Sequence, residues 1–270
     1  MYRILAAALA VALVTPSDVS AQGWPAPAAG LTRTGDPEII FTFDDGPDPR
    51  TTERVLETLE QHQVSAIFFM VGWRFQRGDT VKSRALVDRI LDGGHVIANH
   101  TITHAQLCGL QPEGIDQEIA GAREILEREA RMSIPWFRTP YGAHCSRLVE
   151  SLTRNGIDHF HWDIDPQEWQ GKSAKSTAAY VIKKLARLDG RAVLLMHDTK
   201  PATVAALPEI LTWMQTENAR RKSIGRRQIR VISGPELAAE RAAPTLAWLT
   251  QARSEEHTSE LHSRQYIVCR

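Results

Sequence analysis

Glu38-Ile-Ile-Phe-Thr-Phe-Asp-Asp-Gly-Pro47 is the stretch that decides the fold. Its apolar, β-branched and aromatic residues predict a strand over 38–43, and Gly46-Pro47 ends that strand in a turn. The strand delivers two adjacent carboxylates, Asp44 and Asp45, to the rim of a sheet, where loops build binding sites. Two neighbouring carboxylates repel each other and are costly to desolvate, so a cation beside them is the natural way to hold them there.

Short apolar runs alternate with amphipathic helical runs along the rest of the chain. This alternation implies parallel strands joined by right-handed crossovers, and roughly seven such units favour a closed barrel over an open sheet. We therefore predict an α/β fold, a distorted seven-stranded (β/α) barrel of the TIM type, within residues 36–250. The expected strands are 38–43, 65–71, 96–99, 135–138, 159–164, 192–197 and 228–232, and the expected helices are 52–63, 81–91, 112–129, 146–155, 177–188, 203–215 and 235–241.

The overall charge and the apolar runs argue against two classes of protein, those that bind nucleic acids and those that span a membrane. The 270 residues include 32 acidic and 32 basic side chains, which gives zero formal net charge. Proteins that bind nucleic acids usually carry a basic excess, so this balance argues against them. No internal apolar run approaches the ~20 residues of a membrane-spanning helix.

The two ends of the chain lack the alternation of strands and helices that is expected for its middle. Residues 1–21 have the layout of a secretory signal peptide, with an apolar stretch over 4–14 and a small-residue cleavage site that ends at Ala21. We expect cleavage there and export to the periplasm or the medium, with an uncleaved anchor as the alternative. Residues 22–35 are expected to form a flexible leader. Residues 251–270 are expected to be an unstructured tail; they resemble a translated sequencing-adapter oligonucleotide, and a genuine disordered tail is the alternative.

Two cysteines precede that tail, Cys108 and Cys145, and each follows a polar motif. An even pair of cysteines in neighbouring loops of an exported protein can form a disulfide. Their spacing alone does not decide between a disulfide and two free thiols, so both stay open.

His100 and His104 follow the strand expected at 96–99. Two histidines and one carboxylate are a common protein ligand set for a catalytic zinc, and they leave one position open for water. The second carboxylate of the Asp44-Asp45 pair is then free to act as a base. The pattern indicates a metal-assisted hydrolase.

Five motifs of the chain stand in the order of a known family. They resemble the successive motifs of the polysaccharide deacetylases, the NodB-homology domain of carbohydrate esterase family 4. Any one of these motifs is a weak signal, but five in order over 38–233 make a strong one. In chain order they are Thr42-Phe-Asp-Asp-Gly-Pro47, His100-Thr-Ile-Thr-His104, Arg138-Thr-Pro-Tyr141, Asp165-Pro-Gln-Glu-Trp169 and Leu195-Met-His197.

The resemblance implies how the metal and the base are held. Asp45 and the two histidines would bind a divalent metal, usually zinc, although cobalt and nickel also suit this ligand set. Asp44 would be the general base, and the Arg138 guanidinium beside it would keep it ionised and oriented. The backbone N–H of Tyr141 would help to stabilise the oxyanion.

The resemblance also implies a general acid. His197 would protonate the departing amine, because an amine anion is a very poor leaving group. In the family an aspartate before the tryptophan of the fourth motif supports this histidine, whereas this chain has Glu168 there. The extra methylene puts the geometry of that support in question. Trp169 and Leu195 would wall the sugar and acetyl pocket.

The activity implied is the removal of N-acetyl groups from a polymer or oligosaccharide that contains N-acetylglucosamine, by a monomeric enzyme. Peptidoglycan, chitin oligomers and exopolysaccharide all fit this description. One alternative is an O-acetyl (xylan) esterase that uses the same site. The other is a carbohydrate-binding module that has lost catalysis, and the intact motif residues argue against it.

Overall fold

The computed structural model describes residues 35–134 and 136–241. The predicted signal peptide, the leader up to residue 34 and the predicted tail lie outside the described residues. Five strands form one sheet: β1 (Glu38–Asp44), β2 (Ala66–Met70), β3 (Val96–Asn99), β4 (Arg191–His197) and β5 (Arg230–Val231). The helices are α1 (Thr52–Gln61), α2 (Thr80–Asp92), α3 (Pro112–Ala130), α4 (Ser146–Arg154), α5 (Ala174–Ala186) and α6 (Pro201–Ser223), with short 3-10 turns at Gly72–Phe75, Leu107–Gly109, Pro140–Gly142 and Glu168–Gln170.

The strands are all parallel and follow the order β3-β2-β1-β4, with β5 paired to the start of β1. Single parallel bridges continue the pairing from Asn99 of β3 to Phe137, and from Phe137 to His159. A further bridge joins Ile164 to Leu194 of β4. The pairings therefore close into a ring, and the predicted α/β fold with parallel strands is confirmed.

Two of the predicted strands, 135–138 and 159–164, are present only as these isolated bridges; Pro135 lies outside the described residues. The Arg138 side chain forms hydrogen bonds with the backbone of the second segment. The Arg138 guanidinium donates to the carbonyls of Phe160 (3.0 Å) and His161 (3.3 Å). The Arg138 guanidinium thus bonds to this side of the ring, where strand pairing is reduced to single bridges.

The helices match the predictions in order but not at every end, and the last predicted helix, 235–241, is present as a helix over 234–241. The largest difference is α6, which was expected to end at residue 215 and runs on to Ser223. Residues 216–223, the polar end of α6, are held by tertiary contacts that helix propensity does not predict. The Asn218 side chain exchanges two hydrogen bonds with the backbone of Ile229, at 2.8 and 2.7 Å.

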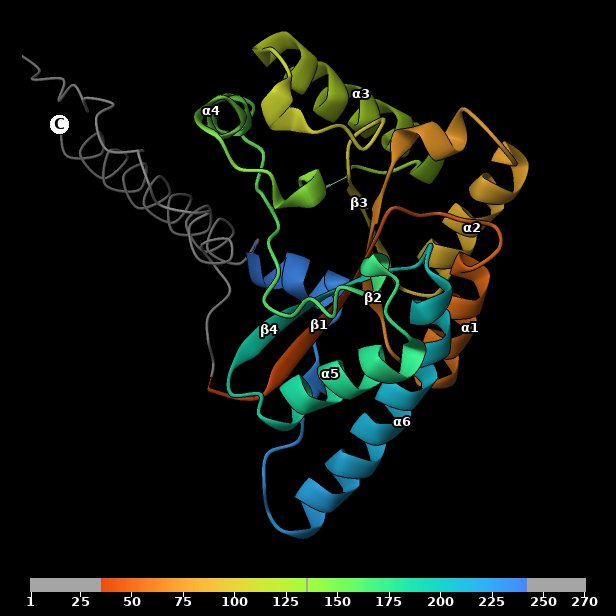
Figure 1. The fold of residues 1–270 in the computed structure, drawn as a ribbon, viewed down its shortest axis with the longest axis vertical. Helices are drawn as coiled ribbons and strands as arrows, with labels where there is room; N and C mark the ends of the chain where they lie inside the picture. The colour runs from red at the N-terminus through yellow and green to blue at the C-terminus, as the bar shows by residue number, and fades with distance from the viewer. Residues whose placement is uncertain (1–34, 135, 242–270) are drawn as a thin grey trace, which may run out of the picture.

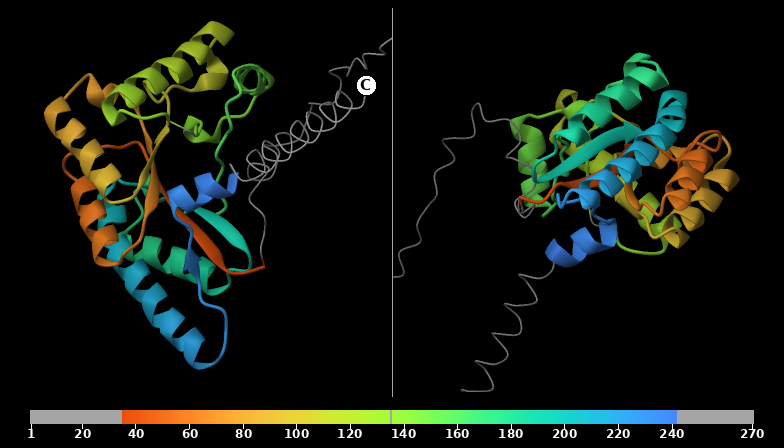
Figure 2. Two further views of the ribbon diagram at one scale, coloured as in Figure 1. Left: turned by 180° about the vertical axis from the view of Figure 1, so that it is seen from behind. Right: turned by 90° about the horizontal axis from the view of Figure 1, so that it is seen from below.

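Helices surround the ring of strands (Figures 1 and 2). Alternate strand residues explain this layering, because successive side chains point to opposite faces. Ile39, Phe41 and Phe43 of β1 pack into the large cluster shared with the helices, whereas Ile40 packs into a second cluster inside the ring. Both faces of β1 are buried, as is usual for a parallel sheet between layers. Of the helices in the described ranges, none is long and apolar enough to cross a membrane.

Candidate active site

The carboxyl ends of two neighbouring strands place an acid beside a histidine. Asp44 is the last residue of β1, and its register partner on β4 is His197, the last residue of that strand. Parallel neighbours lie about 4.8 Å apart, so the two side chains belong to one site. Asp44 shares the inward-facing alternation with Ile40 and Thr42, and its side chain is almost fully buried.

The next residue, Asp45, leaves the strand in the left-handed region, at φ 75°. Aspartate tolerates this conformation better than most residues. It breaks the strand's alternation, so both carboxylates reach the same histidine: His100 Nε2 lies 3.7 Å from Asp44 Oδ2 and 3.6 Å from Asp45 Oδ1. The following Gly46 is required, because a Cβ there would overlap the buried Asp198 carboxylate.

Asp45, His100 and His104 form a candidate metal site, because one potential ligand atom of each lies within 4.8 Å of the other two. His104 Nε2 is 3.1 Å from Asp45 Oδ1. Burial by itself raises the pKa of Asp45, but the hydrogen bond from His104 and the neighbouring histidine charges outweigh it and lower that pKa well below the usual range. This cluster is built to keep Asp45 ionised.

The arrangement fits a tetrahedral ion. Ligand atoms about 2.0–2.2 Å from zinc stand about 3.3–3.6 Å from one another, close to the 3.1 and 3.6 Å separations found here. His100 Nδ1 lies 2.8 Å from the carbonyl oxygen of Arg138, which fixes the proton on Nδ1 and leaves the Nε2 lone pair free. We conclude that these residues suit a divalent metal with nitrogen and oxygen ligands.

Arg138 lies behind the carboxylates with no exposed surface. Its Nη1 donates to Asp44 Oδ1 at 2.7 Å and to the hydroxyl of Thr42 at 2.8 Å, and its guanidinium stacks 4.0 Å over the ring of Phe69. Burial lowers the pKa of Arg138, and the Asp44 carboxylate opposes that shift. A buried ion pair with this many partners orients Asp44 in one position.

Glu168 reaches His197 despite its extra methylene. Its Oε1 lies 2.9 Å from His197 Nδ1, and it also accepts hydrogen bonds from the His197 backbone N–H (2.8 Å) and the Thr203 hydroxyl (3.1 Å). Burial alone lowers the pKa of His197, but the hydrogen bond and charge of Glu168, with the charges of the two aspartates, raise it above the usual value. The longer side chain therefore makes the contact that the sequence left in question.

A pocket of about 330 Å³ gathers most of the predicted site residues at the barrel rim. Trp169 and Tyr141 on its wall are 49% and 67% exposed, whereas Leu195 is buried. Arg138 and Glu168 support the pocket from behind. The predicted residues on the wall are Asp44, Asp45, His100, His104, Tyr141, Trp169, Leu195 and His197.

Four further wall residues were not singled out from the sequence: Thr139, Trp162, Asp165 and Lys200. Thr139 and Asp165 lie inside the quoted motifs. Lys200 follows β4 by three residues, at the cap of α6. Loops that follow strand carboxyl ends line the active site of such barrels, so this rule could have found Lys200.

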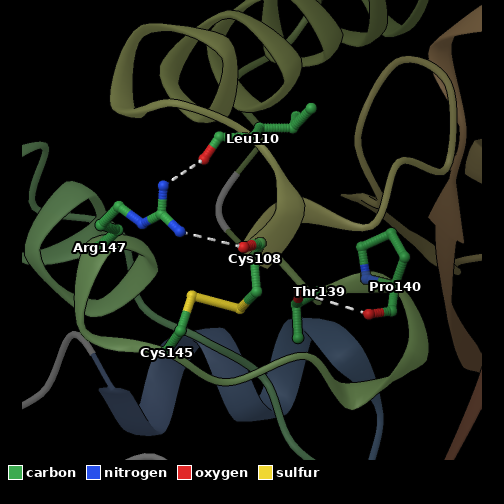
Figure 3. Close-up of a disulfide and its surroundings, with 6 residues drawn as sticks. All are labelled: Cys108, Leu110, Thr139, Pro140, Cys145 and Arg147. Carbon is green, nitrogen blue, oxygen red and sulfur yellow. Dashed lines mark hydrogen bonds between the residues drawn. A yellow bond between two sulfur atoms is a disulfide. The ribbon is translucent and has the colours of Figure 1, made fainter.

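A disulfide joins the two loops beside the pocket. Cys108 and Cys145 are bonded, with their Cα atoms 6.0 Å apart, which decides between the disulfide and the two free thiols that the sequence left open. Arg147 reinforces the link by donating to the carbonyls of Leu110 (3.0 Å) and Cys108 (3.3 Å) (Figure 3). The bridge ties the loop after His104 to the start of α4.

Removal of this disulfide is expected to lower the free energy of unfolding by about 3–4 kcal/mol, because it closes a loop of 37 residues that the unfolded chain would otherwise leave open. Chemical denaturation of the wild type and of a Cys108→Ser/Cys145→Ser variant measures this. Reductant should shift the wild-type midpoint and leave that of the variant unchanged. Equal midpoints for the oxidised wild type and the variant would contradict the expectation.

Comparison with known proteins places these features in a family. The family profile described as polysaccharide deacetylase matches residues 32–160. A peptidoglycan-N-acetylglucosamine deacetylase of Bacillus cereus is 32% identical over 187 residues, which are 68% of this chain and 65% of that protein. A chitooligosaccharide deacetylase of Bradyrhizobium sp. (strain ANU 289) is 31% identical over 169 residues, 62% of this chain and 74% of that protein.

A solved structure shares the fold. The family 4 carbohydrate esterase from Streptomyces lividans, in complex with acetate, superposes with a TM-score of 0.59 at 29% identity. The match covers 67% of this chain and 88% of that chain. The chain thus spans most of the esterase but just under two thirds of the Bacillus cereus relative.

Proposed function

Because the chain belongs to the polysaccharide deacetylase family, we propose that it is a metal-dependent hydrolase that removes acetyl groups from N-acetylglucosamine units of a poly- or oligosaccharide. The observation that carries the proposal is the separation of two adjacent carboxylates. Asp44 is fixed by Arg138 at 2.7 Å, next to His197 in the sheet, while Asp45 turns to His104 at 3.1 Å. One acid is thereby available as a base and the other as a ligand.

Asp45, His100 and His104 would hold the metal, which we propose is zinc, with cobalt or nickel as substitutes on the same ligands. When bound, the metal polarises the acetamide carbonyl and lowers the pKa of water at the site. The ring of His104 packs edge-on against that of Tyr141 at 4.5 Å, which brings the Tyr141 backbone to the metal side of the pocket. Its N–H is proposed to stabilise the oxyanion.

Two proton transfers are proposed for this chain's residues. Asp44 accepts a proton from the water as the water oxygen attacks the acetamide carbon, and the Arg138 guanidinium, 2.7 Å away, holds the Asp44 carboxylate in place for this transfer. His197 then donates a proton to the nitrogen as the C–N bond breaks. Glu168 engages Nδ1 of His197, so the proton to be given stands on Nε2. The products are acetate and a free amine on the sugar.

The remaining pocket residues would hold the sugar. Trp169 offers a half-exposed aromatic face, on which a pyranose ring can stack, and the buried Leu195 closes the apolar end where the acetyl methyl group would lie. We further propose that a monomeric domain over 36–250 acts outside the cytoplasm, since the signal-peptide layout of residues 1–21 suits a cell-wall or extracellular carbohydrate substrate.

Acetate release from N-acetylated chitooligosaccharides and from acetylxylan, measured side by side with the same zinc-loaded protein, tests the proposed reaction. We expect release from the N-acetylated substrate. Release from acetylxylan alone would assign the site to an O-acetyl esterase instead. Binding of either carbohydrate without any acetate release would favour a module that has lost catalysis.

Glu168→Gln is expected to move the alkaline limb of the pH–kcat profile to lower pH. A general acid must be protonated, so turnover is retained below the pKa of His197 and is lost as pH rises through it. Glu168 raises that pKa through its hydrogen bond and charge, and glutamine keeps the shape without the charge. The measurement is kcat from pH 5 to pH 10, with Glu209→Gln as a surface control; an unshifted limb would remove Glu168 from this role.

A further inference from the structure

The loop that carries His104 is held by a side chain outside the five motifs, Glu118 of α3. Its Oε2 accepts hydrogen bonds from the backbone N–H groups of Ile102 (3.0 Å) and Thr103 (2.9 Å), and its Oε1 accepts one from the Thr103 hydroxyl (2.7 Å). A carboxylate that accepts from two consecutive N–H groups fixes the direction of that backbone, because such charge-assisted bonds are strong.

This loop needs external support. Thr101 has φ 73° and His104 has φ 60°, so two of its residues occupy the left-handed region without being glycine. Each such residue costs on the order of 1 kcal/mol or more, and it persists only where the surroundings over-determine it. The unsupported loop would therefore relax, and His104 would leave its place beside Asp45.

A second contact ties the same loop to the same turn of α3. Asn99, the last residue of β3, donates from its side chain to the carbonyl of Ile119 (2.8 Å) and accepts from the Thr101 N–H (2.8 Å). The Thr101 hydroxyl in turn accepts from the backbone N–H of His104 (3.1 Å). One turn of α3, where Glu118 and Ile119 are neighbours, thus supports this loop from one side. From the other side the backbone N–H groups of Gly72 and Trp73 donate to the carbonyls of Thr101 and Ile102, both at 2.9 Å.

We propose that Glu118 is a positioning residue of the metal site. It touches neither the metal ligands nor the pocket wall, and it acts by holding the 101–104 loop so that the His104 imidazole faces Asp45 and His100. The inference rests on the proposed function, in which His104 is a ligand. Under this proposal α3 contributes to the metal affinity through Glu118, although none of the three proposed ligands lies on that helix.

Zinc affinity of three variants tests the proposal, by competition with a chromophoric chelator. Glu118→Ala is expected to weaken zinc binding about 10–100-fold, the range for residues that orient metal ligands. Glu118→Gln should recover most of that loss, because its amide oxygen can still accept from both N–H groups. Glu124→Ala, an exposed glutamate on the same helix, should bind zinc like the wild type. At saturating zinc, turnover by Glu118→Ala should rise towards that of the control.

The results of these zinc titrations test the positioning role of Glu118 separately from the metal site itself. Unchanged zinc affinity in Glu118→Ala overturns the positioning role, whereas a wild-type protein that binds no zinc overturns the metal site itself. If Glu118→Ala does not fold, the zinc affinity of Glu118→Asp tests the positioning role instead. It keeps the charge but is one methylene too short to span to Thr103, so weakened zinc binding supports the proposal and unchanged binding overturns it. The zinc-induced rise in the unfolding midpoint gives the same comparison independently of activity.

Discussion

Asp44→Asn is expected to lower kcat by about 10²–10⁴-fold, the range for loss of a general base, while zinc binding stays close to that of the wild type. Asparagine fills the same space and can still accept a hydrogen bond from Arg138, but it cannot take a proton from water. The ligand atoms of Asp45, His100 and His104 are unaffected by the change. Steady-state turnover and zinc titration on one preparation measure both effects.

Asp45→Asn is the matched control for this experiment, because it makes the same chemical change one residue later. Loss of a charged ligand should weaken zinc binding in Asp45→Asn far more than in Asp44→Asn. Equal loss of zinc affinity in the two variants would contradict the assignment of separate tasks to the two carboxylates. Wild-type turnover by Asp44→Asn would remove it from the role of base.

Arg138→Met is expected to lower the free energy of unfolding by about 3–5 kcal/mol and to suppress turnover. Methionine fills much of the volume but leaves Asp44 as a buried charge without its partner, which is the costly way to break a buried ion pair. It also leaves the carbonyls of Phe160 and His161 without the guanidinium donors. Denaturant unfolding measures the first effect and acetate release the second.

The double variant Arg138→Met/Asp44→Asn separates lost pairing from lost packing. If an unpaired carboxylate is the main cost, replacing it by a neutral amide should recover part of the stability, so the two changes should be less than additive. Strict additivity of the two losses would contradict the importance of the ion pair. Turnover should stay low in the double variant, since the base is absent.

The sequence predicted most of the site because its residues cluster at the carboxyl ends of recognisable strands. The Asp44-Asp45 pair and the two histidines lie where the periodicity placed them, and the candidate metal cluster contains the predicted ligands. Parallel register then brings His197 beside Asp44, although 152 residues separate them. Local pattern was sufficient for the two carboxylates and the two histidines, whereas His197 was expected only from the family resemblance.

The remainder depended on contacts that no local pattern encodes. Residues 159–164 looked like a strand, but they pair with their neighbours only through single bridges, and two of their carbonyls accept hydrogen bonds from Arg138. Whether Glu168 could support His197 depended on side-chain reach, and Lys200 enters the pocket wall through the path of a loop. Glu118 lies in an ordinary amphipathic helix, where nothing in the sequence distinguishes it from exposed glutamates such as Glu124.

The central claim is that this site removes N-acetyl groups only with a metal on Asp45, His100 and His104. The most direct test is acetate release from N-acetylchitooligosaccharides by protein that has been stripped with a chelator and then reloaded with one equivalent of Zn²⁺. We expect no release from the stripped protein and full recovery on reloading. Equal release before and after stripping, or none after reloading, would contradict the account.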